Sequence, residues 1–170
     1  MSDEIINKVA SSGIIQLDLE EIAPRGQRVL YDIKQNLWQE LVLKEEEFRS
    51  FIKSNDWSVY KDQYVALTCS TDAIVPTWAY MLLLTALKPF AKKVIFGNLD
   101  TLNTVLWVES LKQLDNNTFN DARVVVKGCS TIPVPEAAFT ELANILLPRV
   151  KSLMFGEPCS TVPVYKAAKK

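Results

Sequence analysis

Three cysteines in identical surroundings are the residues of this sequence whose type and spacing could do chemistry. They are Cys69, Cys129 and Cys159, the only cysteines in the 170 residues, and each is followed by Ser-Thr. The first two are 60 residues apart and the last two are 30 apart. A deprotonated thiol binds metals and attacks electrophiles, whereas a cysteine that only fills space needs no hydroxyl pair after it. The repetition therefore favours metal binding or thiol chemistry.

The sequence contains no histidine, which excludes Ser-His-Asp and Cys-His catalysis and any imidazole-ligated metal. Ligation by three sulfurs then leaves two candidate cofactors. One is zinc, with Asp72, Asp100, Glu157 or water in the fourth position. The other is a four-iron iron–sulfur cluster in which one iron lacks a cysteine ligand.

The serines after the three sulfurs, Ser70, Ser130 and Ser160, are candidates for hydrogen bonds that orient the ligands. Two other interpretations stay open. In the first, the protein is a metal-free thiol enzyme, in which one cysteine attacks a sulfur donor and another resolves the persulfide or disulfide. In the second, the cysteines are inert and the protein is a homodimeric structural or interaction module.

The elements that must position these cysteines are typical of an α/β fold with a mainly parallel sheet of βαβ units flanked by helices. From residue 64 onward, short β-branched runs alternate with helical patterns, and the strands recur at steps of 29, 30 and 29 residues. The expected strands are Tyr64–Thr68, Lys93–Phe96, Arg123–Lys127 and Ser152–Phe155, and the expected helices are Pro76–Leu87, Thr101–Leu114 and Pro135–Leu147.

The first third of the chain predicts additional strands on the same sheet, followed by a helix. The strand-like stretches are Ile14–Leu19, Arg28–Ile33 and Leu37–Leu43, and the helical stretch is Lys44–Ser54. No flexible linker separates this part from the rest. We therefore expect a single α/β domain over residues 1–165, with a frayed basic tail at 166–170.

Each cysteine follows a predicted strand directly or within a few residues. The carboxyl ends of parallel strands lie at one edge of a sheet, where open α/β sheets hold ligands. We therefore expect the three thiols to meet at this edge if their strands are neighbours. Strand order does not follow from the sequence.

The predicted helix that contains Trp78–Leu84 is apolar on nearly all sides. A helix of this kind is buried on more than one side. Either it lies at the centre of the fold, or it packs against a second copy of the chain in a homodimer.

Composition restricts the remaining function classes. Nineteen basic and 20 acidic residues give a net charge of −1, so we expect neither nucleic acid nor a membrane as a partner. Residues 1–4 lack the basic and apolar regions of a signal peptide. An odd number of cysteines in a chain of this size indicates reduced thiols, and we expect a cytoplasmic protein.

The chain resembles the uncharacterised bacterial domain-of-unknown-function family twenty-four-eighty along nearly its whole length, and several sequence motifs carry the resemblance. They are Val29-Leu30-Tyr31-Asp32-Ile33, Ala66-Leu67-Thr68-Cys69-Ser70, Val75-Pro76-Thr77-Trp78-Ala79-Tyr80, Val126-Lys127-Gly128-Cys129 and Gly156-Glu157-Pro158-Cys159-Ser160-Thr161-Val162-Pro163. The family has no established activity to carry over. The resemblance implies a link to iron–sulfur cluster assembly. It therefore favours an iron–sulfur cluster over zinc as the cofactor, and it suggests iron–sulfur assembly proteins as partners.

Overall fold

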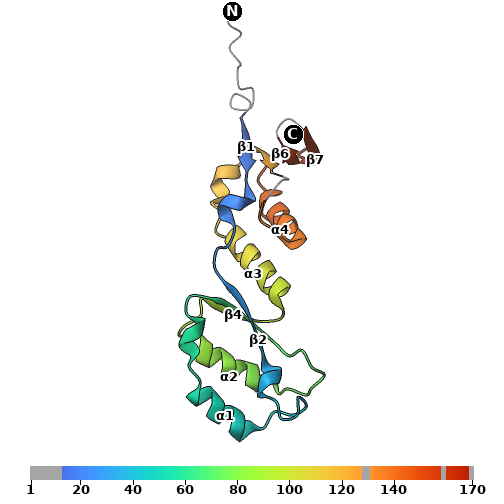
Figure 1. Cartoon of the computed structure of the whole chain (residues 1–170). Helices are drawn as coiled ribbons and strands as arrows, with labels where there is room; N and C mark the ends of the chain where they lie inside the picture. The colour runs from blue at the N-terminus through green and yellow to red at the C-terminus, as the bar shows by residue number, and fades with distance from the viewer. Residues whose placement is uncertain (1–12, 128–130, 158–159, 169–170) are drawn as a thin grey trace, which may run out of the picture. The chain divides into compact units, whose positions relative to one another are not determined.

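The chain forms two compact units, each with its own sheet. The structure, a computed structural model, describes residues 13–127, 131–157 and 160–168. The terminal unit consists of residues 1–24 and 106–170, and the middle unit consists of residues 25–105 (Figure 1). The single domain expected over residues 1–165 stays a prediction, because two compact units can still fold together as one domain.

The terminal unit contains a four-stranded sheet in the order β1-β5-β6-β7. Its first three strands are parallel, and β7 runs antiparallel to β6. The strands are β1 (Ile14–Leu17), β5 (Arg123–Val126), β6 (Ser152–Glu157) and β7 (Ser160–Lys166), joined by the helix α4 (Glu136–Leu146) and the 3-10 turns η1 (Leu19–Ile22) and η4 (Asn116–Phe119).

The middle unit contains a three-stranded parallel sheet in the order β2-β3-β4. The strands are β2 (Arg28–Asp32), β3 (Tyr64–Thr68) and β4 (Lys93–Phe96), with the helices α1 (Glu45–Ser54) and α2 (Thr77–Leu87) and the 3-10 turns η2 (Ile33–Asn36) and η3 (Trp57–Tyr60). The helix α3 (Leu99–Leu111) follows β4 and crosses the boundary between the units after Val105.

Local sequence explains where these elements begin and end. Helices α2 and α4 follow Pro76 and Pro135, whose fixed φ and missing N–H suit a helix start. Helix α1 carries three glutamates in its first turn, where they face the positive end of the helix dipole. Strand β5 is a run of three valines after Arg123, and β3 is a mainly apolar run, and both are buried along most of their length.

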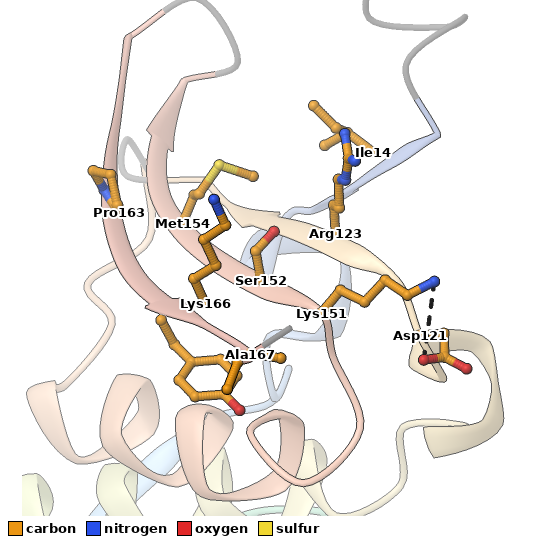
Figure 2. A pocket seen from close by; sticks show the side chains of 11 residues that line it. Ile14, Asp121, Arg123, Lys151, Ser152, Met154, Pro163, Lys166 and Ala167 are labelled. Carbon is orange, nitrogen blue, oxygen red and sulfur yellow. Dashed lines mark ion pairs between the residues drawn. The ribbon is translucent and has the colours of Figure 1, made fainter. Parts of the chain in front are cut away.

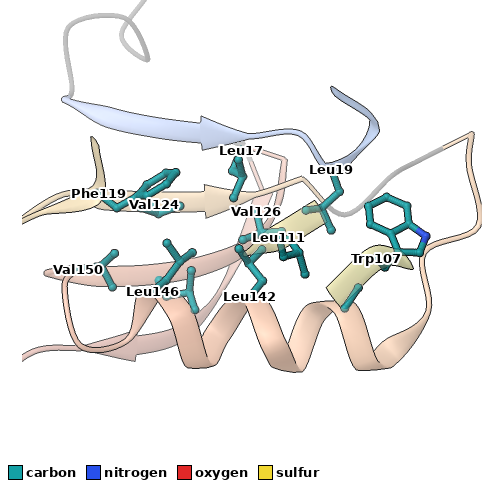
Figure 3. Close-up of a cluster of buried hydrophobic side chains, with 12 residues drawn as sticks. Leu17, Leu19, Trp107, Leu111, Phe119, Val124, Val126, Leu142, Leu146 and Val150 are labelled. Atoms are coloured by element: carbon teal, nitrogen blue, oxygen red, sulfur yellow. The ribbon is translucent and has the colours of Figure 1, made fainter. Parts of the chain in front are cut away.

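Each unit has its own hydrophobic core between one helix and one face of its sheet. In the terminal unit, side chains of α4 and of β5 point toward each other, and Leu17, Leu111 and Trp107 complete the cluster (Figure 3). In the middle unit, α2 covers β3 in the same way, with Phe48 of α1 and Trp57 of η3 against it. Burial of these side chains stabilises each unit by about 25 cal/mol per Å² of apolar surface.

The two units are built on one repeated plan. The structural equivalents lie 59 residues apart, and buried residues correspond to buried residues: Phe48, Val65, Leu67, Ala79, Leu83 and Leu87 match Trp107, Val124, Val126, Ala138, Leu142 and Leu146. The turns correspond as well. Asp62 and Asp121 have φ of 60° and 57°, and their N–H groups donate to Phe90 O at 3.0 Å and Arg149 O at 2.9 Å.

The structure confirms the α/β fold and most of the elements expected from the sequence. The expectation that the N-terminal strands extend one common sheet is wrong, because β1 pairs with β5 in one sheet while β2 pairs with β3 in the other. The stretch Leu37–Leu43 is not a strand. It folds back on itself through an isolated bridge between Trp38 and Val42, with positive φ at Gln39 and Glu40.

Helix α2 is buried on one side only. Ala79, Leu83 and Leu87 are buried, whereas Met81 is 63% exposed. Burial on more than one side within the fold, the first of the two alternatives for this helix, is therefore wrong. Its packing against a second copy stays a prediction.

We predict that Leu142→Ala lowers the free energy of unfolding by about 2–5 kcal/mol, because the side chain is fully buried and its removal leaves a cavity. Thr140→Ala is the control on the same helix, since Thr140 is exposed and its hydroxyl bonds only to its own turn. We expect it to change stability by no more than about 0.5 kcal/mol. Urea denaturation measures both. A cost below about 1 kcal/mol for Leu142→Ala would contradict this account of the core.

Candidate functional site at the carboxyl edges of the sheets

Charged side chains gather at the carboxyl edge of the terminal sheet. Asp18 directly follows β1, Lys127 directly follows β5, and Glu157 is the last residue of β6. Lys127 Nζ lies 2.7 Å from Asp18 Oδ2, and both side chains are partly buried. The backbone N–H of Lys127 also donates to Leu17 O at 3.0 Å, so the ion pair is anchored at the end of the β1–β5 ladder.

This ion pair shifts the titration of both partners. The hydrogen bond from Lys127, with that from the Glu20 N–H, holds the pKa of the Asp18 carboxyl below its ordinary value despite some desolvation. The same hydrogen bond raises the pKa of the Lys127 ammonium, and the charges of Asp18, Glu20 and Glu157 add to this effect. Lys127 is therefore a fixed cation among three carboxylates.

Cys129 and Cys159 lie outside the described residues, as does Ser130, but the residues on either side of them are fixed. Cys129 stands between Lys127 and Thr131, and the Thr131 N–H donates to Glu20 Oε1. Cys159 stands between Glu157 and Ser160, which face each other in the β6–β7 ladder. Gly156 has φ of +121°, and a Cβ there would lie 2.6 Å from Ser160 O, so the start of this turn requires glycine.

The carboxyl edge of the middle sheet carries a different set of groups around Cys69. The Cys69 thiol is half-buried and donates to Thr71 O at 3.4 Å. Asp32, the last residue of β2, accepts from the N–H groups of Ser70 at 3.1 Å and Lys34 at 3.0 Å. Burial acts to raise the pKa of the Asp32 carboxyl, but these bonds and one from the Ser70 hydroxyl outweigh it and hold the pKa below its ordinary value.

Tyr80 of α2 completes this edge. Burial raises the pKa of its phenol, and the nearby acidic groups of Cys69 and Asp32 raise it further. The phenol therefore stays protonated at neutral pH and can donate a hydrogen bond. Its ring packs edge-on against Phe96 with the centroids 4.9 Å apart.

The residues predicted from the sequence divide between the two units. Cys69, Ser70, Asp72 and Asp100 belong to the middle unit, whereas Glu157 and Ser160 belong to the terminal unit together with the segments that contain Cys129, Ser130 and Cys159. Asp72 and Asp100 are exposed, the latter in the first turn of α3. In the part of the chain that the structure describes, no three cysteine or acidic side chains are grouped closely enough to hold a metal ion.

Sequence analysis missed Asp18, Lys127, Asp32 and Tyr80 as members of these edges. A signal for the two aspartates was present, because Leu17-Asp18-Leu19 and Tyr31-Asp32-Ile33 share one pattern, with a buried residue on each side of the aspartate. Asp18 directly follows β1 and Asp32 is the last residue of β2, and each caps the 3-10 turn that comes next. No comparable signal marks the pairing of Asp18 with Lys127.

A groove of about 820 Å³ lies on the sheet of the terminal unit, away from the carboxyl edge. Figure 2 shows Arg123, Met154 and Lys166 rising from neighbouring strands into this groove, with Lys151 beside Asp121 at its rim. The Lys151 Nζ to Asp121 Oδ1 distance is 4.0 Å, and both groups are exposed. The groove is open and carries more basic than acidic groups.

These features define an α/β protein of two repeated parallel-sheet units with polar carboxyl edges. Within the described part of the chain, no helix is long and apolar enough to cross a membrane. The chain belongs to the DUF2480 family, described as a protein of unknown function, whose family model matches residues 3–167. This confirms the resemblance found in the sequence. No curated protein and no solved structure matches the chain.

We predict that Asp18 and Lys127 stabilise each other in a pH-dependent way. The folded-state pKa of Asp18 is lowered, so its contribution is present above its unfolded pKa of about 4 and is lost as the pH falls through the folded value. A double-mutant cycle with Asp18→Asn and Lys127→Met isolates the coupling, because asparagine can still cap η1. Urea denaturation should show coupling at pH 7 that fades below about pH 4. A coupling free energy of zero at pH 7, or one that is the same at pH 7 and below pH 4, would contradict the prediction.

Proposed function

We propose that this protein binds a metal ion through the thiolates of Cys129 and Cys159 at the carboxyl edge of the terminal sheet. The observation that carries this proposal is the pairing of β5 with β6 as parallel neighbours, with Val126 beside Phe155. Adjacent strands are about 4.8 Å apart. Cys129 follows Val126 by three residues and Cys159 follows Phe155 by four. The described chain therefore leaves the same edge of the sheet toward both cysteines, which supports one shared ion.

The neighbouring described residues supply suitable oxygen ligands and balancing charge. Glu157 is two residues before Cys159, and Glu20 bonds to the Thr131 N–H two residues after Cys129. Zinc accepts two thiolates together with carboxylate oxygens in tetrahedral geometry. The Lys127 ammonium lies near both glutamates, as its raised pKa indicates, and would offset part of the negative charge that two thiolates and carboxylates bring together.

The choice between zinc and an iron–sulfur cluster depends on Cys69. A four-iron cluster takes cysteine thiolates at most or all of its irons, so the pair alone does not supply enough sulfur ligands. Cys69 is in the middle unit, where its thiol already donates to Thr71 O. We therefore propose the pair as the ligand set and zinc as the metal that fits it best.

The test is elemental analysis for zinc and iron, with acid-labile sulfide, on protein purified without oxygen. We predict about one zinc per chain. Cys129→Ser and Cys159→Ser should each lose most of it, because a hydroxyl does not replace a thiolate ligand. Cys69→Ser is the matched control, since it removes the same phrase from the other sheet, and it should retain the metal.

Three results would contradict the proposal. Equal metal in Cys129→Ser, Cys159→Ser and the unaltered chain would show that neither sulfur is a ligand. If the protein contains iron and sulfide and all three variants lose them, the site is an iron–sulfur cluster held by three cysteines and not a metal ion held by two. If the protein binds no metal even after reconstitution, thiol exchange between Cys129 and Cys159 becomes the better hypothesis, and unequal alkylation rates of the thiols would test it.

A further inference from the structure

Among the residues that the structure describes, no strand pairs with the outer edge of β4, whereas its counterpart in the terminal unit is covered. In the described part of the middle unit, β4 pairs with β3 alone. The equivalent strand β6 pairs with β5 on one side and with the antiparallel strand β7 on the other. Because the units share one plan, β7 marks the place beside β4 that is open in the middle unit.

Apolar side chains surround this open edge, and we call Met81, Leu84, Val94 and Phe96 the β4 edge surface. Phe96 is 66% exposed, whereas its equivalent Phe155 is 38% exposed. Val94 is partly exposed, whereas its equivalent Leu153 is buried. The difference matches the absence of a strand beside β4.

The helix beside β4 is also more apolar than its counterpart. Met81 and Leu84 of α2 are both exposed, and their equivalents in α4 are Thr140 and Ala143. These side chains, with Tyr80 and Phe96, line an apolar groove of about 400 Å³ between α2 and β4. A contiguous apolar surface of this kind on a folded chain indicates a protein interface.

We propose that the β4 edge surface binds the same surface of a second copy of this chain, with the two β4 strands paired antiparallel in one continuous sheet. A lone added strand does not account for the apolar helix, because β7 covers β6 beside the small or polar residues Thr140 and Ala143. A two-fold pairing does account for it, since it brings α2 of both copies to the same face of the joined sheet.

The residues of β4 suit such a pairing about Ile95. In this register, directly opposed residues of the two β4 strands have their side chains on the same face of the joined sheet, so Val94 lies beside the partner's Phe96. Lys93, the charged residue of the strand, lies opposite the partner's Gly97 and not opposite its own copy. Prolines and β-bulges are two of the features that block pairing at the edge of a sheet. Strand β4 contains no proline, and its ladder with β3 has no bulge.

Light scattering coupled to gel filtration at several concentrations tests the oligomeric state. We expect a dimer for the full chain, and we expect Met81→Glu to weaken it at least tenfold, because a carboxylate would be buried in an apolar contact. Thr140→Glu is the matched control at the equivalent exposed position of α4, and it should remain dimeric. A monomer at every concentration, or a dimer unaffected by Met81→Glu, would overturn the proposal.

Cross-linking tests the register independently of stability. Ile95→Cys should form a disulfide-linked dimer under mild oxidation, since directly opposed residues of an antiparallel pair have Cβ atoms about 4.5–5.5 Å apart. Peptide mapping by mass spectrometry separates this link from any link through the native cysteines. Met154→Cys, at the equivalent position of β6 beside β7, should give no such link. Absence of the Ile95→Cys link in a dimeric protein would overturn the proposed pairing.

Discussion

The parallel ladder between β1 and β5 is the interaction on which the terminal unit depends. It pairs Ile14 with Arg123 and Leu17 with Val126, so it joins segments separated by the whole middle unit. The backbone bond from Lys127 to Leu17 and the ion pair from Lys127 to Asp18 continue the ladder beyond the strands. Closing so long a segment costs conformational entropy, which burial of Leu17, Val124 and Val126 in the common core offsets.

Repetition of one plan explains both what the units share and where they differ. The core residues from Phe48 onward, the turns at Asp62 and Asp121 and the starts of α2 and α4 correspond at a spacing of 59 residues. Even the edge-on ring pair of Tyr80 with Phe96 has its equivalent in Phe139 with Phe155. The differences lie at the margins of the sheets. A seventh strand covers β6. Lys127 follows β5 at the position equivalent to Thr68, the last residue of β3, and the helix faces beside β4 and β6 differ in polarity.

Local patterns were sufficient to predict most elements of this fold. Runs such as Tyr64–Thr68 and Lys93–Phe96 are strands with the expected bounds, because β-branched residues between turn residues have few alternatives. The strand β7 was missed, since Pro163 interrupts the run of Val162, Val164 and Tyr165 and argues against a strand, which here depends on its ladder with β6. Division into two sheets could not be predicted, because strand order is set by packing and not by local preference.

Only those parts of the candidate site that depend on residues adjacent in the sequence could be predicted. Repeated Cys-Ser-Thr phrases identified the loops that follow β3, β5 and β6, but not that β3 belongs to a different sheet from the other two. The partnership of Asp18 with Lys127 joins residues 109 positions apart, so no local spacing could reveal it.

The order of the segments along the chain constrains how the protein is made. During synthesis, every residue of the middle unit has been added by Val105, whereas β1 has no partner until Arg123–Val126 has been added. Ile14–Leu17 must therefore leave the ribosome early and stay unpaired while an entire sheet is completed downstream. Strand β1 is thus made before every strand of the middle unit and is fixed only after them, and for that interval its apolar residues are exposed to wrong pairings.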